Sequence, residues 1–235
     1  MRHLRTLSLV LTLALLIACR VERAPEQRAG VAASQQGVQS AAARAISERP
    51  MAHRREGQGL LDSARTALTG GERAPAAALL HRAAAFFVRQ ANDPPSGGTA
   101  DLLAAARGLD SLAMDVSLGR TADASRLDRL SAHANLAEAE RHGALAAVAW
   151  STRSKESVSD ELVMAADHVE RATLDANLTS SPVMRRLVAE LRAVARDLSS
   201  QQGLDLRDLD EPLSSLHIEI GALHRRLEGA ARNKM

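Results

Sequence analysis

The sequence contains very little cysteine and very few aromatic residues. Its 235 residues include one Cys, no Tyr, one Trp and two Phe. A single Cys excludes an internal disulfide and the cysteine-rich zinc and iron–sulfur sites. Strands and base-stacking modules favour aromatic side chains, so their shortage argues against sandwiches, barrels and a nucleic-acid partner.

Recognisable catalytic motifs are missing as well. The chain has no HExxH, no glycine-rich phosphate loop and no GxSxG. Metalloprotease, nucleotide-binding and serine-hydrolase chemistries are therefore not indicated. We expect no catalytic residues and no cofactor, and we predict that the protein is not an enzyme.

The apolar residues follow a helical pattern. They make up 46% of the chain, and most are Ala, Leu or Val. Spacings of three and four residues place them on one side of a helix. The clearest stripes are Leu102–Leu109–Val116, Leu162–Val169–Ala176, Met184–Leu191–Leu198 and Leu213–Ile220–Leu227. They predict an all-α fold, an antiparallel helical bundle with coiled-coil-like seams; the alternative is a solenoid of short α-hairpins.

Capping residues mark where these helices should begin. Thr99 follows a stretch rich in Pro and Gly. Further candidates for helix starts are Thr121, Ser157, Asp210 and Ser181, which directly precedes a proline. The loops between them are mostly short, which favours antiparallel neighbours.

One segment resembles another segment that lies 60 residues later in the sequence. Asp101-Leu102-Leu103 and the residues after it match Glu161-Leu162-Val163 and their successors. A duplicated helical hairpin is one interpretation. The other is that any two amphipathic helices rich in Ala and Leu align this well.

The first twenty residues carry the most specific signal. Arg2 and Arg5 precede an apolar run over residues 7–18 that only Ser8 and Thr12 interrupt. A basic start followed by such a run is typical of a secretory signal. The run is too short to span a bilayer as a mature helix.

This run ends in Leu16-Ile17-Ala18-Cys19, which includes the only Cys of the chain. The tetrapeptide resembles the lipobox of bacterial lipoproteins, in which a small residue precedes the Cys that becomes the acylated first residue. The resemblance covers the signal alone, and it implies a diacylglycerol thioether and an amide-linked acyl chain on Cys19. Two or three such chains hold a protein stably on a membrane. An ordinary signal peptide or anchor with an incidental thiol is the alternative.

The resemblance also suggests a domain order and a location. Residues 1–18 are the expected signal peptide, residues 19–45 a flexible tether poor in large apolar side chains, and residues 46–235 the helical domain. In Gram-negative members of the family, Asp after the acylated Cys favours the inner membrane, so Arg20 implies the outer membrane. Loss of Arg2 and Arg5 leaves 28 basic and 28 acidic residues, which indicates no polyanionic partner.

Two pairs of side chains resemble parts of metal sites. Met164 and His168, four residues apart, present a thioether and an imidazole that suit copper or haem iron. Packing of Met164 in the core is the simpler interpretation. Glu138 and His142, four residues apart, could form half of a carboxylate metal site, but the ferritin-like arrangement requires Glu and His three residues apart on two helices, and neither copy is present. We therefore assign no metal site.

Two aromatic residues are candidates for an interface. Adjacent residues of a helix cannot both point into one seam, so Phe86, next to Phe87, is one of them. Trp150, at the end of an Ala-rich segment, either closes the end of the bundle or anchors a partner.

Together these patterns predict a lipid-anchored, non-enzymatic helical scaffold or interaction module of the bacterial cell envelope, facing the periplasm. The expected partners are the membrane, through the lipid on Cys19, and an envelope protein. The alternative function is a periplasmic helical-bundle carrier of a metal or haem.

Overall fold

The computed structural model describes residues 56–94, 97–120, 124–200 and 209–232. The predicted signal peptide 1–18, with Leu16, Ile17, Ala18 and Cys19, and the tether 19–45 lie outside the described residues. The described residues form seven α-helices and no strand, which confirms the all-α prediction. They are α4 (Glu56–Thr69), α5 (Arg73–Asn92), α6 (Thr99–Ser117), α7 (Ala124–Ser151), α8 (Lys155–Asp175), α9 (Pro182–Ser199) and α10 (Asp210–Arg232). None of these helices is both long and apolar enough to cross a membrane.

Local capping signals place several helix starts. Ser181 is the N-cap of α9, and its hydroxyl accepts a hydrogen bond from the Met184 N–H at 3.0 Å. α10 begins at Asp210, whose carboxylate faces the positive end of the helix dipole. α8 begins at Lys155, slightly before the predicted Ser157. These signals work because capping depends on neighbouring residues alone.

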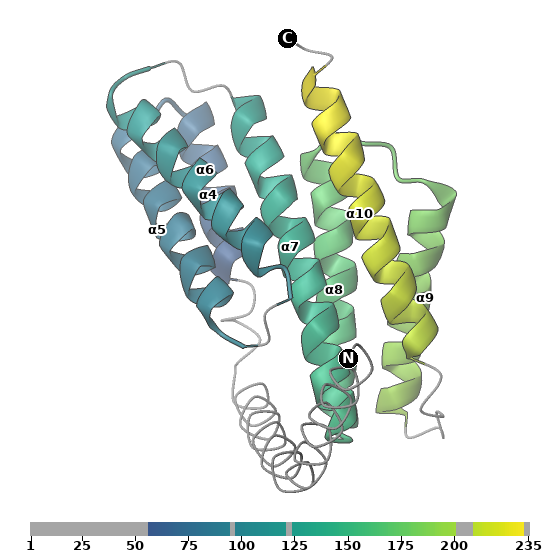
Figure 1. The fold of residues 1–235 in the computed structure, drawn as a ribbon. Helices are drawn as coiled ribbons and strands as arrows, with labels where there is room; N and C mark the ends of the chain where they lie inside the picture. The colour runs from purple at the N-terminus through teal and green to yellow at the C-terminus, as the bar shows by residue number, and fades with distance from the viewer. Residues whose placement is uncertain (1–55, 95–96, 121–123, 201–208, 233–235) are drawn as a thin grey trace, which may run out of the picture. The chain divides into compact units, whose positions relative to one another are not determined.

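The helices pack as two four-helix bundles that share α7 (Figure 1). In the first bundle α4, α5, α6 and α7 each pack against the next, and α4 returns to α7. In the second, α7, α8, α9 and α10 close in the same way. Each bundle has its own hydrophobic core. The predicted helical bundle is therefore confirmed, in a double form.

α7 supplies side chains to both cores because it lies between them. Leu127 and Ala137 belong to the first core, whereas Leu136 and Ala146 belong to the second. Apolar contacts therefore occur on more than one side of this helix. This explains why residues 121–150 show no single regular stripe.

The two bundles repeat with a period of 82 residues. α5 and α8 begin at Arg73 and Lys155, and the turns before them contain Gly71 and Arg153, both with positive φ. Each of the nine buried positions of α5 has a buried counterpart 82 residues later in α8. The sequence similarity at a spacing of 60 residues therefore does not correspond to the structural repeat. It paired α6 with α8, although α6 corresponds by position in its bundle to α9.

Phe86 and Phe87 are both buried, with 2% exposure each. Their rings pack edge to face with centroids 5.4 Å apart, and both lie against Gly57 of α4, which has no side chain to exclude them. α5 packs against both α4 and α6, so it buries more than one stripe. The prediction that Phe86 is an interface residue is wrong. Trp150 packs against the second core and stays partly exposed, so its role remains a prediction.

Candidate ligand pocket and buried polar network

Polar side chains fill the junction where α4 of the first bundle approaches α8 of the second, next to α7. The central group is Asp175, in the last turn of α8, whose side chain is 5% exposed. Its carboxylate accepts hydrogen bonds from Ser131 at 2.5 Å, Asn135 at 3.1 Å, Arg65 at 3.0 Å and Arg171 at 3.1 Å. Four donors from three helices compensate for the removal of this charge from water.

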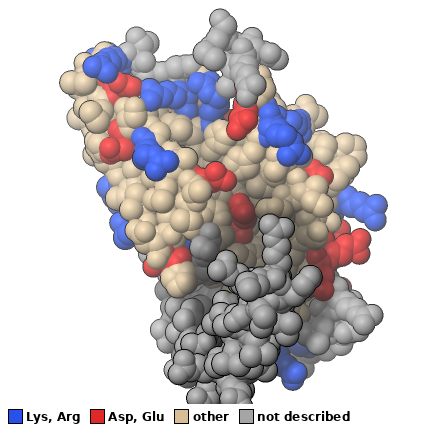
Figure 2. All heavy atoms as spheres, in the orientation of Figure 1, with Lys and Arg blue, Asp and Glu red and all other residues tan. Residues whose placement is uncertain are grey.

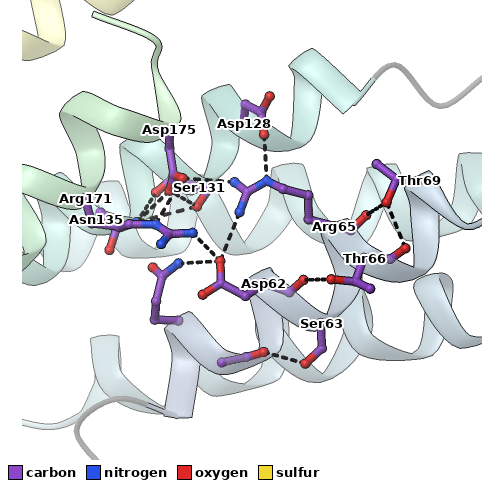
Figure 3. A network of polar contacts seen from close by, with 12 residues as sticks. Asp62, Ser63, Arg65, Thr66, Thr69, Asp128, Ser131, Asn135, Arg171 and Asp175 are labelled. Atoms are coloured by element: carbon purple, nitrogen blue, oxygen red, sulfur yellow. Dashed lines mark hydrogen bonds and ion pairs between the residues drawn. The ribbon is translucent and has the colours of Figure 1, made fainter.

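Arg65 connects Asp175 to two further carboxylates. It donates to Asp62 at 3.0 Å and to Asp128 at 2.9 Å. Burial alone would lower the pKa of the Arg65 guanidinium, but the hydrogen bond to Asp128 and the charges of all three carboxylates hold that pKa above its ordinary value. Arg171 also donates to Asp62, so two arginines and two aspartates link α4 to α8 (Figure 3). We call the following residues the junction network: Asp62, Arg65, Asp128, Ser131, Asn135, Arg171 and Asp175.

A second polar layer lies between α7 and α8. His168 Nδ1 is 2.8 Å from the side-chain oxygen of Asn135, and the amide nitrogen of Asn135 donates to Asp175. Because that oxygen can only accept, Nδ1 of His168 carries the proton. The His168 ring stacks on His142, whose Nδ1 is 2.5 Å from a carboxylate oxygen of Glu161. The His168 ring is thus held in one orientation and one tautomer.

A pocket of 390 Å³ opens beside this layer. Its buried lining residues are Asn135, Met164 and His168, and its more exposed ones are Gln58, Gly59, Asp62, Asp167 and Arg171. We call it the junction pocket. Ligand pockets measure roughly 300–1,000 Å³, so this one suits a small ligand. It is a small space for a haem.

The structure brings together one of the predicted pairs. Met164 and His168 line the junction pocket, and both side chains are buried. Glu138 lies 3.9 Å from His142, whose other nitrogen faces Glu161. Within the described ranges, no group of three or more His, Cys, Asp or Glu side chains is arranged to hold a metal ion.

Sequence reasoning missed the junction network. Its ion pairs between α4 and α8 join residues about a hundred positions apart, such as Arg65 and Asp175, which are separated by 110. The local signal for it was the pair Arg171 and Asp175, at a spacing of four on one helix face. That spacing is common on solvated helices, so it did not stand out.

A second histidine pair joins α7 to α10. The Nδ1 atoms of His133 and His224 are 3.3 Å apart, and Nε2 of His224 is 3.7 Å from a carboxylate oxygen of Asp101. Burial lowers the pKa of His133 below its ordinary value, and the neighbouring His224 lowers it further. Arg129 acts in the same direction, whereas Asp101 and Glu228 oppose it.

The folded protein should therefore lose stability as the pH falls below about 6.5, the ordinary pKa of histidine. The pKa of His133 is lower in the folded than in the unfolded chain, so below that pH the unfolded chain binds a proton that the folded one does not. The loss levels off once the pH passes the folded pKa. Urea unfolding between about pH 8 and about pH 5 measures it.

The variant His133→Gln should flatten this pH dependence, because it removes the titrating group. His81→Gln is the matched control, since His81 is an exposed imidazole paired with Asp110. An unchanged pH slope in His133→Gln would contradict the assignment.

The contacts at the junction suit binding and cohesion more than nucleophilic chemistry. The Ser131 hydroxyl donates to Asp175, and Nδ1 of His168 donates to Asn135, so this serine is not paired with an imidazole base. No protein-family model, curated protein or solved structure matches the chain.

Proposed function

We propose that this chain is a lipid-anchored, non-enzymatic scaffold or interaction module of the bacterial cell envelope. The observation that supports it most is the position of the only Cys, directly after Leu16-Ile17-Ala18 at the end of the apolar run. Acyl chains on Cys19 hold the protein at the outer membrane, and the helical domain faces the periplasm. Such an anchor removes the need for a membrane-binding surface on the domain itself.

The described helices are consistent with a protein partner. The charged groups of the junction network bind one another and link α4 of the first bundle to α8 of the second. Trp150, partly exposed at the end of α7, is the aromatic residue that we expect at the partner interface. Large apolar side chains are also exposed at Val88, Met114, Leu118, Leu174, Val183 and Ile218.

Cys19→Ser is expected to release the protein from the membrane without unfolding it. The variant is expressed with a conventional cleavable secretory leader in place of residues 1–18, so that leader removal does not depend on acylation. The wild-type chain should sediment with membranes and carry acyl mass on its N-terminal peptide, whereas the variant should stay soluble with the same circular dichroism. Fractionation and mass spectrometry measure both results.

Arg20→Asp is the matched control, because it keeps Cys19. We expect this variant to remain acylated and, in a Gram-negative host, to move to the inner membrane. A wild-type N-terminus that is cleaved elsewhere and carries no acyl mass would refute the anchor.

A further inference from the structure

The junction pocket contains a thioether and an imidazole side by side. Met164 and His168 both line it, and their exposed fractions are 1% and 8%. They lie four residues apart on α8, and side chains at this spacing share one helix face with Cβ atoms about 6 Å apart. A single ion between them can therefore be reached by both.

Met164 is a buried methionine that lines a pocket. It shares the pocket with Asn135, Asp167 and Arg171. Methionine usually fills gaps between apolar side chains. Where its sulfur lines a pocket beside a nitrogen ligand it has a second possible use, because a thioether is a soft metal ligand.

His168 is held in the form that a metal ligand requires. Its Nδ1 donates to Asn135, so in the neutral imidazole the lone pair is on Nε2. Asn135 is fixed in turn by hydrogen bonds to Asp175 and to the Ser131 carbonyl, the latter at 2.9 Å. Metal-binding histidines typically donate their second N–H to such an acceptor, which sets the tautomer and the ring orientation.

The available ligands define the class of ion. Zinc and hard divalent cations require three or more nitrogen, thiolate or oxygen ligands, and no such His, Cys, Asp or Glu cluster occurs in the described part of the chain. One thioether and one imidazole suit a soft monovalent ion of low coordination number.

We propose that Met164 and His168 form a binding site for a soft monovalent metal ion, Cu(I) or Ag(I), in the junction pocket. The site goes beyond the proposed function and does not depend on acylation of Cys19. Asn135 is a positioning residue that orients His168.

The experiment titrates Ag(I), which needs no reductant, into the full-length chain carrying Cys19→Ser, because a free thiol would bind the ion independently. Methionine methyl groups labelled with carbon-13 are followed by NMR. The Met164 methyl signal and the His168 ring signals should shift together and saturate at one equivalent. Unmoved Met164 or His168 signals at one equivalent would overturn the proposal, and this measurement needs no pocket variant.

Variants test the same site by affinity. Met164→Leu and His168→Asn should each weaken Ag(I) binding by about 100-fold or more, and Asn135→Ala by about 10–100-fold through lost positioning. Met114→Leu and His217→Asn are matched controls, since both residues are exposed and lie outside the pocket. Circular dichroism confirms folding. Equal affinity in wild type, Met164→Leu and His168→Asn would also overturn the site.

Discussion

Asp175→Ala is expected to lower the free energy of unfolding by about 3–5 kcal/mol, the usual cost of removing one partner from a buried ionic group. The carboxylate is 5% exposed and accepts four hydrogen bonds. Its loss leaves the Ser131 hydroxyl without its acceptor, removes one of the acceptors of the Asn135 amide nitrogen, and leaves the charges of Arg65 and Arg171 less compensated. Urea unfolding followed by circular dichroism measures the change.

Asp110→Ala is the control for this prediction. Asp110 is 56% exposed and pairs with His81 at 2.6 Å, and exposed pairs contribute less than about 1 kcal/mol. A double-mutant cycle with Arg65→Ala isolates the contribution of the contact between α4 and α8. If Asp175→Ala cost no more than Asp110→Ala, the junction network would not be a determinant of stability.

The prediction also addresses how the bundles cooperate. Arg65 belongs to the first bundle and Asp175 to the second, and each bundle has a separate core. They share α7 and this ionic junction. Weakening the junction should therefore loosen the coupling between the bundles, which a broader or two-step unfolding transition would show.

What the sequence predicted correctly depends on neighbouring residues. Ser181 and Asp210 mark helix starts because caps act within one turn. Met164 and His168 could be paired because their spacing on one helix fixes their shared face. That they line a pocket became visible only with α4 and α7 packed around them.

What the sequence did not predict depends on packing between distant segments. α7 looks irregular because two bundles use it, and no feature within residues 124–151 says which helices will cover it. Phe86 was expected outside because the space left by Gly57 belongs to another helix. Asp175 and Arg65 meet only after both bundles form on α7. The 82-residue repeat preserves burial more clearly than residue identity, so a search by identity favoured a shorter spacing.

Gly98→Ala should cost about 2–5 kcal/mol, because two separate penalties coincide at this position. Gly98 precedes α6 with a φ of +69°, a conformation that costs other residues about 1–2 kcal/mol. A Cβ there would also overlap the carbonyl oxygen of Ala137 and lie 3.1 Å from the carbonyl carbon. Overpacking of this kind typically costs about 1–3 kcal/mol. Unfolding in urea measures the sum.

Gly71→Ala separates the two penalties. Gly71 has nearly the same φ, +75°, but no atom lies within 4 Å of the position that a Cβ would take. It should therefore lose only the conformational part, about 1–2 kcal/mol, and the difference between the variants measures the close contact of α6 with α7. Equal losses in the two variants would mean that the approach of Gly98 to Ala137 relaxes freely, and that this contact does not set how α6 packs on α7.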